Sequence, residues 1–175
     1  MLIRGTHLNS RAVFFLIFLL CAGLLAVAFY MEHFMGLEPC PLCWLQRFGF
    51  MAAGLVSLLA VLHGPQGFGV RVYGFLLAVS AAAGLGFAGR QLWLQSLPAD
   101  QVPACGPSVD YMLDVLPWTE VLTTALRGTG DCAEVTWRFL GLSIPGWTAV
   151  FFTLLVIIGL VMLFRPRKKS SWIQG

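Results

Sequence analysis

Charged side chains are scarce in this sequence. Of its 175 residues only 11% are Asp, Glu, Lys or Arg, whereas 58% are hydrophobic. The mean hydropathy is +0.82. This composition lies outside the range of ordinary soluble domains, so it predicts a membrane protein.

The sequence also lacks the alternation of apolar and polar residues that is typical of transmembrane β-strands. Because lipid offers the backbone no hydrogen-bond partner, the spans must then be α-helices. A hydrocarbon core of about 30 Å needs about 20 helical residues, and four apolar runs are long enough: about 12–30, 44–62, 72–94 and 145–164. We predict an all-α membrane protein, a four-transmembrane-helix bundle that forms one polytopic domain over residues 1–175. The first run exceeds the length of a signal-peptide core, although Ala26–Ala28 resembles a cleavage site.

No internal repeat or low-complexity tract interrupts this pattern, and the basic residues orient it. Seven of the eleven lie before the first span, between the second and third, and after the fourth: Arg4, Arg11, Arg71, Arg165, Arg167, Lys168 and Lys169. The positive-inside rule therefore predicts a cytoplasmic N-terminus, 63–71 loop and C-terminal tail. The loops at about 31–43 and 95–144 then face the opposite side and contain all eight acidic residues. We expect the basic tail to contact the lipid bilayer rather than nucleic acid.

The loop at about 95–144 is far longer than ordinary connections between helices, which indicates a function. Within it, Trp118–Leu126 follows Pro117, precedes Gly128 and has apolar residues along one side. It predicts a short interfacial helix on the membrane surface. In the third span, small residues recur every four positions, at Gly74, Ala78, Ala82 and Gly86. We expect this stripe to face a closely packed helix.

The sequence has five cysteines, and four of them fall on the side predicted to be external: Cys40, Cys43, Cys105 and Cys132. Thiols in a bacterial periplasm tend to be oxidised to disulfides. Proximity in the chain favours pairing Cys40 with Cys43 and Cys105 with Cys132, although four cysteines allow three connectivities. Taken alone, the second pair is typical of a structural staple. Zinc is disfavoured because 26 residues separate this pair. Cys21, inside the first span, is interpreted as a buried apolar residue.

The first pair, Cys40 and Cys43, has a stronger functional interpretation. A Cys-x-x-Cys disulfide closes too small a ring to stabilise much, whereas a thiolate benefits from a helix N-terminus and a nearby cation. Arg47 follows Cys43 by four residues and shares its helix face. An arginine inside a span is a functional candidate, with snorkelling to the headgroups as the alternative. The acceptor of its two electrons is either a soluble oxidant or a molecule dissolved in the membrane. A lipid-embedded quinone would meet the Cys43–Arg47 face, and Arg47 could stabilise negative charge on a quinone oxygen.

Several motifs occur in an order and spacing that resemble a known family, the DsbB family of bacterial inner-membrane disulfide-bond formation proteins. They are Pro-Cys-Pro-Leu-Cys43 with Gln-Arg47, Trp93-Leu-Gln95, Pro103-Ala-Cys-Gly106, Gly130-Asp-Cys-Ala-Glu134 and Phe139-Leu-Gly-Leu-Ser-Ile-Pro-Gly-Trp147. The resemblance implies a location in the bacterial inner membrane, with the active cysteines on the periplasmic side.

The resemblance also implies a reaction cycle. The loop pair Cys105–Cys132 would reoxidise a DsbA-like periplasmic thiol oxidase through a mixed disulfide at Cys105. Electrons would then pass to Cys40–Cys43 and on to ubiquinone or menaquinone, as in the DsbA–DsbB–quinone relay that keeps the bacterial periplasm oxidising. By the same resemblance, Cys43 contacts the quinone and Arg47 assists it.

One position departs from the pattern of the family. Many relatives have a histidine near the outer end of the third span that is thought to help hold the quinone, whereas this chain has Arg90-Gln91. Gln91 can still hydrogen-bond a carbonyl, but it cannot titrate near neutrality. We therefore take Gln91 as a candidate quinone ligand and expect no metal. The alternatives are a vitamin K epoxide reductase-like quinone-linked enzyme, and a non-enzymatic membrane protein whose cysteines are structural or bind metal.

Overall fold

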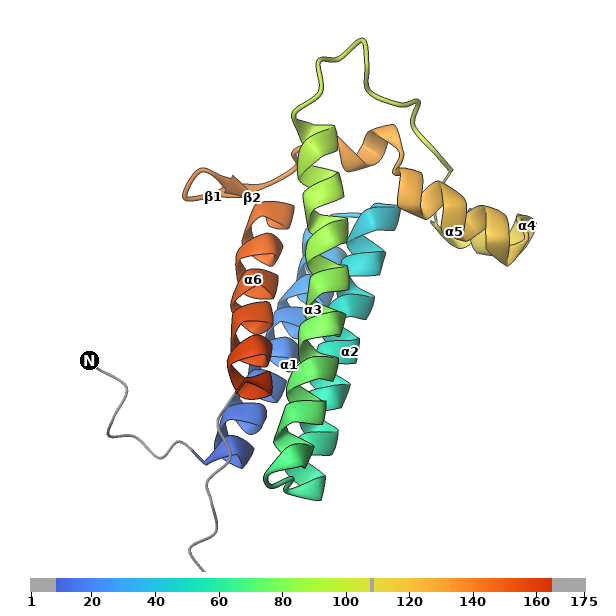
Figure 1. Cartoon of the computed structure of the whole chain (residues 1–175). Coiled ribbons are helices and arrows are strands. Elements are labelled where there is room, and N and C mark those ends of the chain that lie inside the picture. The colour runs from blue at the N-terminus through green and yellow to red at the C-terminus, as the bar shows by residue number, and fades with distance from the viewer. Residues whose placement is uncertain (1–8, 108, 165–175) are drawn as a thin grey trace, which may run out of the picture.

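The computed structural model describes residues 9–107 and 109–164, and within them four helices are long and apolar enough to cross a membrane. These are α1 (Ser10–Met35), α2 (Pro41–His63), α3 (Phe68–Gln95) and α6 (Ile144–Leu163). They form the elongated bundle of Figure 1. The predicted all-α bundle of four transmembrane helices is confirmed, and the chain is a multi-pass membrane protein.

The ends of α2 show why its start was predicted three residues late. Pro41 is the first helical residue, where its fixed φ and missing N–H suit the first turn, and Cys40 is the N-cap. Hydropathy alone places the start at Trp44 because the preceding residues are less apolar. At the other end, Gly64 adopts a left-handed conformation with φ of 57°, which glycine does without steric cost. The earlier start places Cys43 inside the first turn of the helix.

The helix α3 lies between α2 and α6 and packs against both, while α1 packs against α2. A close approach joins α3 to α6 at Gly74, where an added Cβ would lie 2.9 Å from the carbonyl oxygen of Gly159. The predicted small-residue stripe is therefore right at Gly74, but it is wrong at Gly86, which faces open space. A strict four-residue spacing drifts by about 40° per step around a helix of 3.6 residues per turn. Gly84 lies on the packed side instead, against the ring of Phe152.

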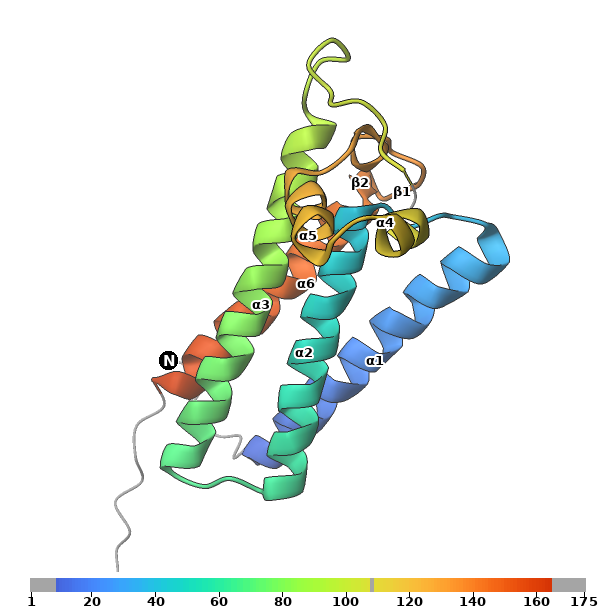
Figure 2. The same cartoon turned by 90° about the vertical axis from the view of Figure 1, so that its right-hand side faces the viewer.

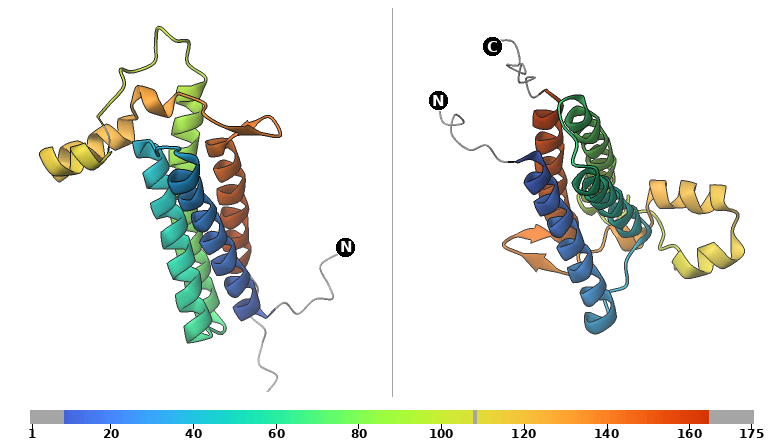
Figure 3. Two further views of the ribbon diagram at one scale, coloured as in Figure 1. Left: turned by 180° about the vertical axis from the view of Figure 1, so that it is seen from behind. Right: turned by 90° about the horizontal axis from the view of Figure 1, so that it is seen from below.

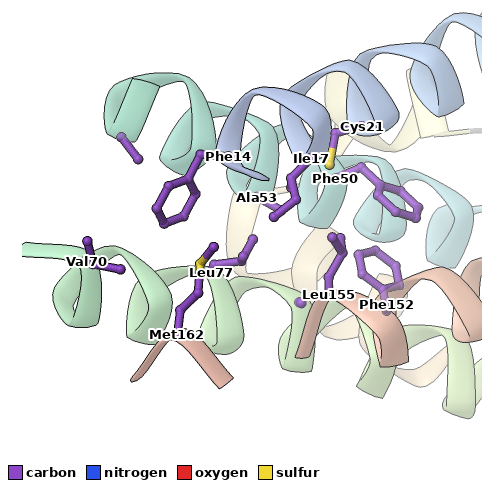
Figure 4. Close-up of a cluster of buried hydrophobic side chains, with 12 residues drawn as sticks. Phe14, Ile17, Cys21, Phe50, Ala53, Val70, Leu77, Phe152, Leu155 and Met162 are labelled. Carbon is purple, nitrogen blue, oxygen red and sulfur yellow. The ribbon is translucent and has the colours of Figure 1, made fainter. Parts of the chain in front are cut away.

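A cluster of buried apolar side chains from all four long helices fills the bundle (Figure 4). At its centre the rings of Phe50 and Phe152 stack with centroids 4.0 Å apart. Cys21 belongs to this cluster and is 1% exposed, which confirms its interpretation as a buried apolar residue. The α1 residues in the cluster come from the half of that helix that precedes Leu25.

The long loop folds over the end of the bundle where α2 begins and α3 ends, hereafter the cysteine end. It contains α4 (Val109–Val115), α5 (Trp118–Arg127), the 3₁₀ turn η1 (Gly130–Cys132), and the strands β1 (Arg138–Phe139) and β2 (Leu142–Ser143). The strands form an antiparallel hairpin. Figure 1 shows the hairpin and the α4–α5 pair projecting on opposite sides of the bundle. The helix predicted at Trp118–Leu126 is confirmed as α5, and its location on the membrane surface stays a prediction.

The helix α1 diverges from the bundle towards the cysteine end. Figure 2 shows α1 and α2 close together at the opposite end and well separated where α1 finishes at Met35. In Figure 3, α1 crosses in front of α2 and α6 when the molecule is seen from behind. This divergence leaves the upper half of α1 free of extensive packing and positions it beside the candidate site.

Candidate functional site

Cys40 and Cys43 lie at the N-terminus of α2, with their Sγ atoms 3.0 Å apart. All five cysteines are free thiols in this structure. The first turn of a helix carries partial positive charge from its unpaired N–H groups, which favours a thiolate there. The local sequence alone produces this arrangement, because Pro41 starts the helix immediately after Cys40.

Cys132 is the third sulfur of the site. It is fully buried on η1 and packs with Leu42, Leu94 and Cys40. Gly128 allows this docking, because it has a φ of 77° and its Cα lies so close to Leu94 and Leu42 that no Cβ fits. The structure therefore brings together sulfurs from two loops that are 92 residues apart in the chain.

Cys105 lies close to the segment that carries Cys132, but its thiol faces away from the other sulfurs. The segments 103–106 and 129–132 are joined by a hydrogen bond from the Gly130 N–H to the carbonyl of Ala104, 3.1 Å long. A second bond of 3.3 Å runs from the Gly106 N–H to the carboxylate of Asp131. The thiol of Cys105 is exposed, whereas that of Cys132 points inward. The predicted disulfide pairing of Cys105 with Cys132 stays a prediction.

The three loop sulfurs differ in acidity. The neighbouring thiol of Cys40 lowers the pKa of Cys132 from 9.0 to about 6. The pKa of Cys40 itself is raised, first by its interaction with Cys132 and second by that with Cys43, to which it donates a hydrogen bond. The pKa of Cys105 is also raised, first by its hydrogen bond with the carboxylate of Asp131. In the reduced protein at neutral pH, buried Cys132 is therefore the thiolate of these three, while Cys40 and Cys105 keep their protons.

Gln91 contacts the sulfurs of α2 directly. Its amide Nε2 lies 3.4 Å from Cys40 Sγ and 3.4 Å from Cys43 Sγ. Its Oε1 accepts a hydrogen bond of 2.6 Å from Gln46. The side chain is 3% exposed. Gln91 therefore hydrogen-bonds the sulfurs of Cys40 and Cys43. Its role as a quinone ligand stays a prediction.

A cavity of about 420 Å³ opens beside Cys43. It is bounded by α1, α2, α6 and the segment 136–139, and most of its lining side chains are apolar, such as Leu24, Met31, Phe50, Trp147 and Phe151. Arg47, Gln46 and Thr148 supply polar groups to its wall. Cys43 also lines a narrow cleft that it shares with Cys40 and Gln91. Cys43 therefore borders both the narrow cleft and the apolar cavity.

Arg47 is 8% exposed and points from α2 towards α1. It forms an ion pair with Glu32 and donates to the carbonyl of Ala28 over 3.2 Å. Its guanidinium lies over the rings of Phe29 and Trp44, at 4.9 Å and 5.1 Å from their centroids. The guanidinium therefore has polar partners within the protein. The sequence shows Glu32 only as a loop acid, because a pairing between two helices leaves no trace in the spacing along either one.

Comparisons with known proteins agree with this arrangement. The profile of the family described as "Disulfide bond formation protein DsbB" matches residues 10–162. The chain belongs to the DsbB family. It is 77% identical to disulfide bond formation protein B of Marinobacter nauticus over 96% of this chain and 100% of the relative. The proteins of the same name from Hahella chejuensis and Nitrosococcus oceani are 59% and 54% identical, over 83% and 91% of this chain and 88% and 94% of theirs.

Membership of the DsbB family makes this chain a disulfide-forming oxidoreductase of the membrane. This supports the enzymatic interpretation over that of a protein whose cysteines are only structural. Within the residues that the structure describes, no group of three or more His, Cys, Asp or Glu side chains is placed to hold a metal ion.

Proposed function

We propose that this DsbB-family protein reoxidises a DsbA-like periplasmic thiol oxidase and passes the electrons through its two cysteine pairs to a membrane quinone. The observation that carries the proposal is the position of Cys43, which borders both the dithiol cleft and the apolar cavity. In this proposal the cysteine end faces the periplasm of a bacterial inner membrane.

The first step is exchange with the soluble partner. A thiolate of the partner attacks the sulfur of Cys105 in an oxidised Cys105–Cys132 pair, and Cys132 leaves as the thiolate. Exposure of Cys105 supports its role as the attacked sulfur, and the lowered pKa of Cys132 makes it the better leaving group. The second thiol of the partner then releases Cys105, so the partner gains a disulfide and the loop pair gains two electrons and two protons.

The second step moves the electrons to α2. Cys132 packs beside Cys40, so its thiolate needs only a short approach to attack Cys40 in an oxidised Cys40–Cys43 pair. Cys43 would then leave as a thiolate beside the cavity. Gln91, with its amide N–H groups 3.4 Å from Cys40 and Cys43, stabilises charge on either sulfur.

The residues of the cavity fit a quinone. Its volume of about 420 Å³ lies in the range of small-molecule sites, and its walls are apolar with a few polar groups. Arg47, Gln46 and Thr148 would hold the polar edge of the ring, and the aromatic and aliphatic side chains would hold its faces. A bound quinone supplies an acceptor for two electrons and two protons. In this proposal the quinone enters the cavity from the lipid.

The test is anaerobic mixing of the purified protein with reduced partner and a soluble quinone, followed by quinol absorbance. We expect turnover by the wild type and by Cys21→Ser, the matched control, and none by Cys40→Ser, Cys43→Ser, Cys105→Ser or Cys132→Ser. Turnover by Cys43→Ser at the rate of the wild type would refute the proposal. An epoxide-reduction assay on the same sample tests the vitamin K-like alternative.

A further inference from the structure

Three uncharged side chains, two of them buried, form a continuous hydrogen-bonded chain from the α2 sulfurs to the wall of the cavity. Gln91 donates to Cys40 and Cys43, Gln46 donates to Gln91, and the Thr148 hydroxyl donates to the Oε1 of Gln46. The three come from α3, α2 and α6. Gln46 and Gln91 are each 3% exposed, so water does not replace these bonds.

The direction of the chain depends on one hydrogen. The Thr148 hydroxyl has a single hydrogen but two acceptors, the Oε1 of Gln46 and the carbonyl of Pro145 at 3.0 Å. When Thr148 donates to Gln46, the amide N–H groups of Gln46 and Gln91 all point towards the sulfurs. When it donates to Pro145, both amides can rotate by half a turn, so that Gln91 presents its oxygen to the sulfurs instead.

The two directions suit two states of Cys43. An amide N–H donated to sulfur favours a thiolate, whereas an amide oxygen favours a protonated thiol, and the structure has Cys43 Sγ 3.6 Å from Gln91 Oε1 as well as 3.4 Å from its Nε2. Amides exchange these roles without a change of shape. When Cys43 loses its proton to water in the cleft, the two amides can rotate so that Gln91 donates to the thiolate. This response needs no titratable side chain at position 91.

We propose that Thr148 and Gln46 are positioning residues that orient the Gln91 amide towards Cys43 and thereby set the reactivity of this sulfur. The inference rests on the proposed role of Cys43 as the sulfur at the cavity, but its test needs no quinone. Other groups that face Cys43 stay unchanged in the test variants: Cys40, Cys132, Arg47, Glu38, Asp131 and Glu134.

The variants are Thr148→Val, which removes the hydroxyl and keeps the shape, and Thr148→Ser, which keeps the hydroxyl. Thr153→Val is the matched control, because Thr153 also lies on α6 but its hydroxyl bonds only the carbonyl of Ala149. The full-length, reduced, quinone-free protein is alkylated with iodoacetamide over a range of pH, and the modification of Cys43 is quantified by fragment mass spectrometry. Protection of buried Cys21 from alkylation in the same samples reports on folding.

We expect Thr148→Val to slow the alkylation of Cys43 by about threefold to tenfold near neutral pH, as befits one lost hydrogen bond. Thr148→Ser and Thr153→Val should keep the rate of the wild type. Equal rates in Thr148→Val and the wild type would overturn the inference, as would slow rates in both Thr148 variants. Neither result would affect the quinone turnover of the wild type, so failure of this inference is distinguishable from failure of the proposed function.

Discussion

Arg47 of α2 and Glu32 of α1 form an ion pair across the wall of the apolar cavity. The pair joins the diverging end of α1 to the helix that carries the dithiol. It also fixes the guanidinium beside the chamber, because a second bond to the carbonyl of Ala28 holds it from the same helix. One cation therefore contributes both to helix packing and to the electrostatics of the site.

Replacing Arg47 with Ala should slow quinone reduction while leaving thiol exchange with the soluble partner measurable. The reason is that the cation lines the cavity and is remote from exposed Cys105. We expect a loss of about tenfold to a hundredfold, comparable to the lower range for loss of an electrostatic stabiliser. Stopped-flow quinol formation and partner oxidation are measured separately. Arg127→Ala is the control, and quinone kinetics unchanged in Arg47→Ala would remove Arg47 from the site.

Replacing Glu32 with Gln should lower the thermal midpoint of the protein in detergent. The substitution leaves the charge of Arg47 buried without its counter-ion, which costs up to about 3–5 kcal/mol for a fully buried pair. The Glu32 side chain is 23% exposed, so the cost here is smaller. The double variant Glu32→Gln/Arg47→Met should recover part of the loss. Full additivity of the two single effects would contradict a direct interaction.

The acidity of Cys132 should depend on the neighbouring thiol of Cys40. In a Cys21→Ser/Cys43→Ser/Cys105→Ser background, thiolate absorbance should rise with a midpoint of about 6 for Cys132, and adding Cys40→Ala, which removes the donor, should move that midpoint towards 9.0. Because the folded-state pKa is depressed, the stabilisation it gives is complete above pH 9.0 and is lost as the pH falls to about 6. Equal midpoints with and without the Cys40 thiol would contradict this dependence.

The contact between α3 and α6 should not tolerate a side chain at Gly74. A Cβ there would lie 2.9 Å from the carbonyl oxygen of Gly159 and 3.1 Å from the backbone nitrogen of Leu163, and backbone atoms cannot rotate away. We expect Gly74→Ala to destabilise the bundle by about 1–3 kcal/mol. Gly86→Ala, on the same helix but facing open space, is the control. Unfolding in mixed micelles followed by circular dichroism measures both, and equal stabilities would contradict the close packing.

The features that the sequence predicted correctly are local ones. Four apolar runs of spanning length predict the bundle, and a proline between Cys40 and Leu42 explains how a helix starts beside the dithiol. The four-residue step from Cys43 to Arg47 predicts their shared face, since 3.6 residues make one turn. The small-residue stripe failed at Gly86 for the same reason, because a four-residue repeat does not keep to one face.

What the sequence by itself determined is the number of spans, the helix at 118–127 and the gathering of four cysteines at one end, because hydrophobic length and turn chemistry act over a few residues. Only the tertiary structure decided that Cys132 meets Cys40, that Glu32 pairs with Arg47, and that Gln91 turns its amide to the sulfurs. These contacts join elements that are far apart in the chain. They depend on how each helix is rotated and tilted against its neighbours, which is set by packing across the whole bundle.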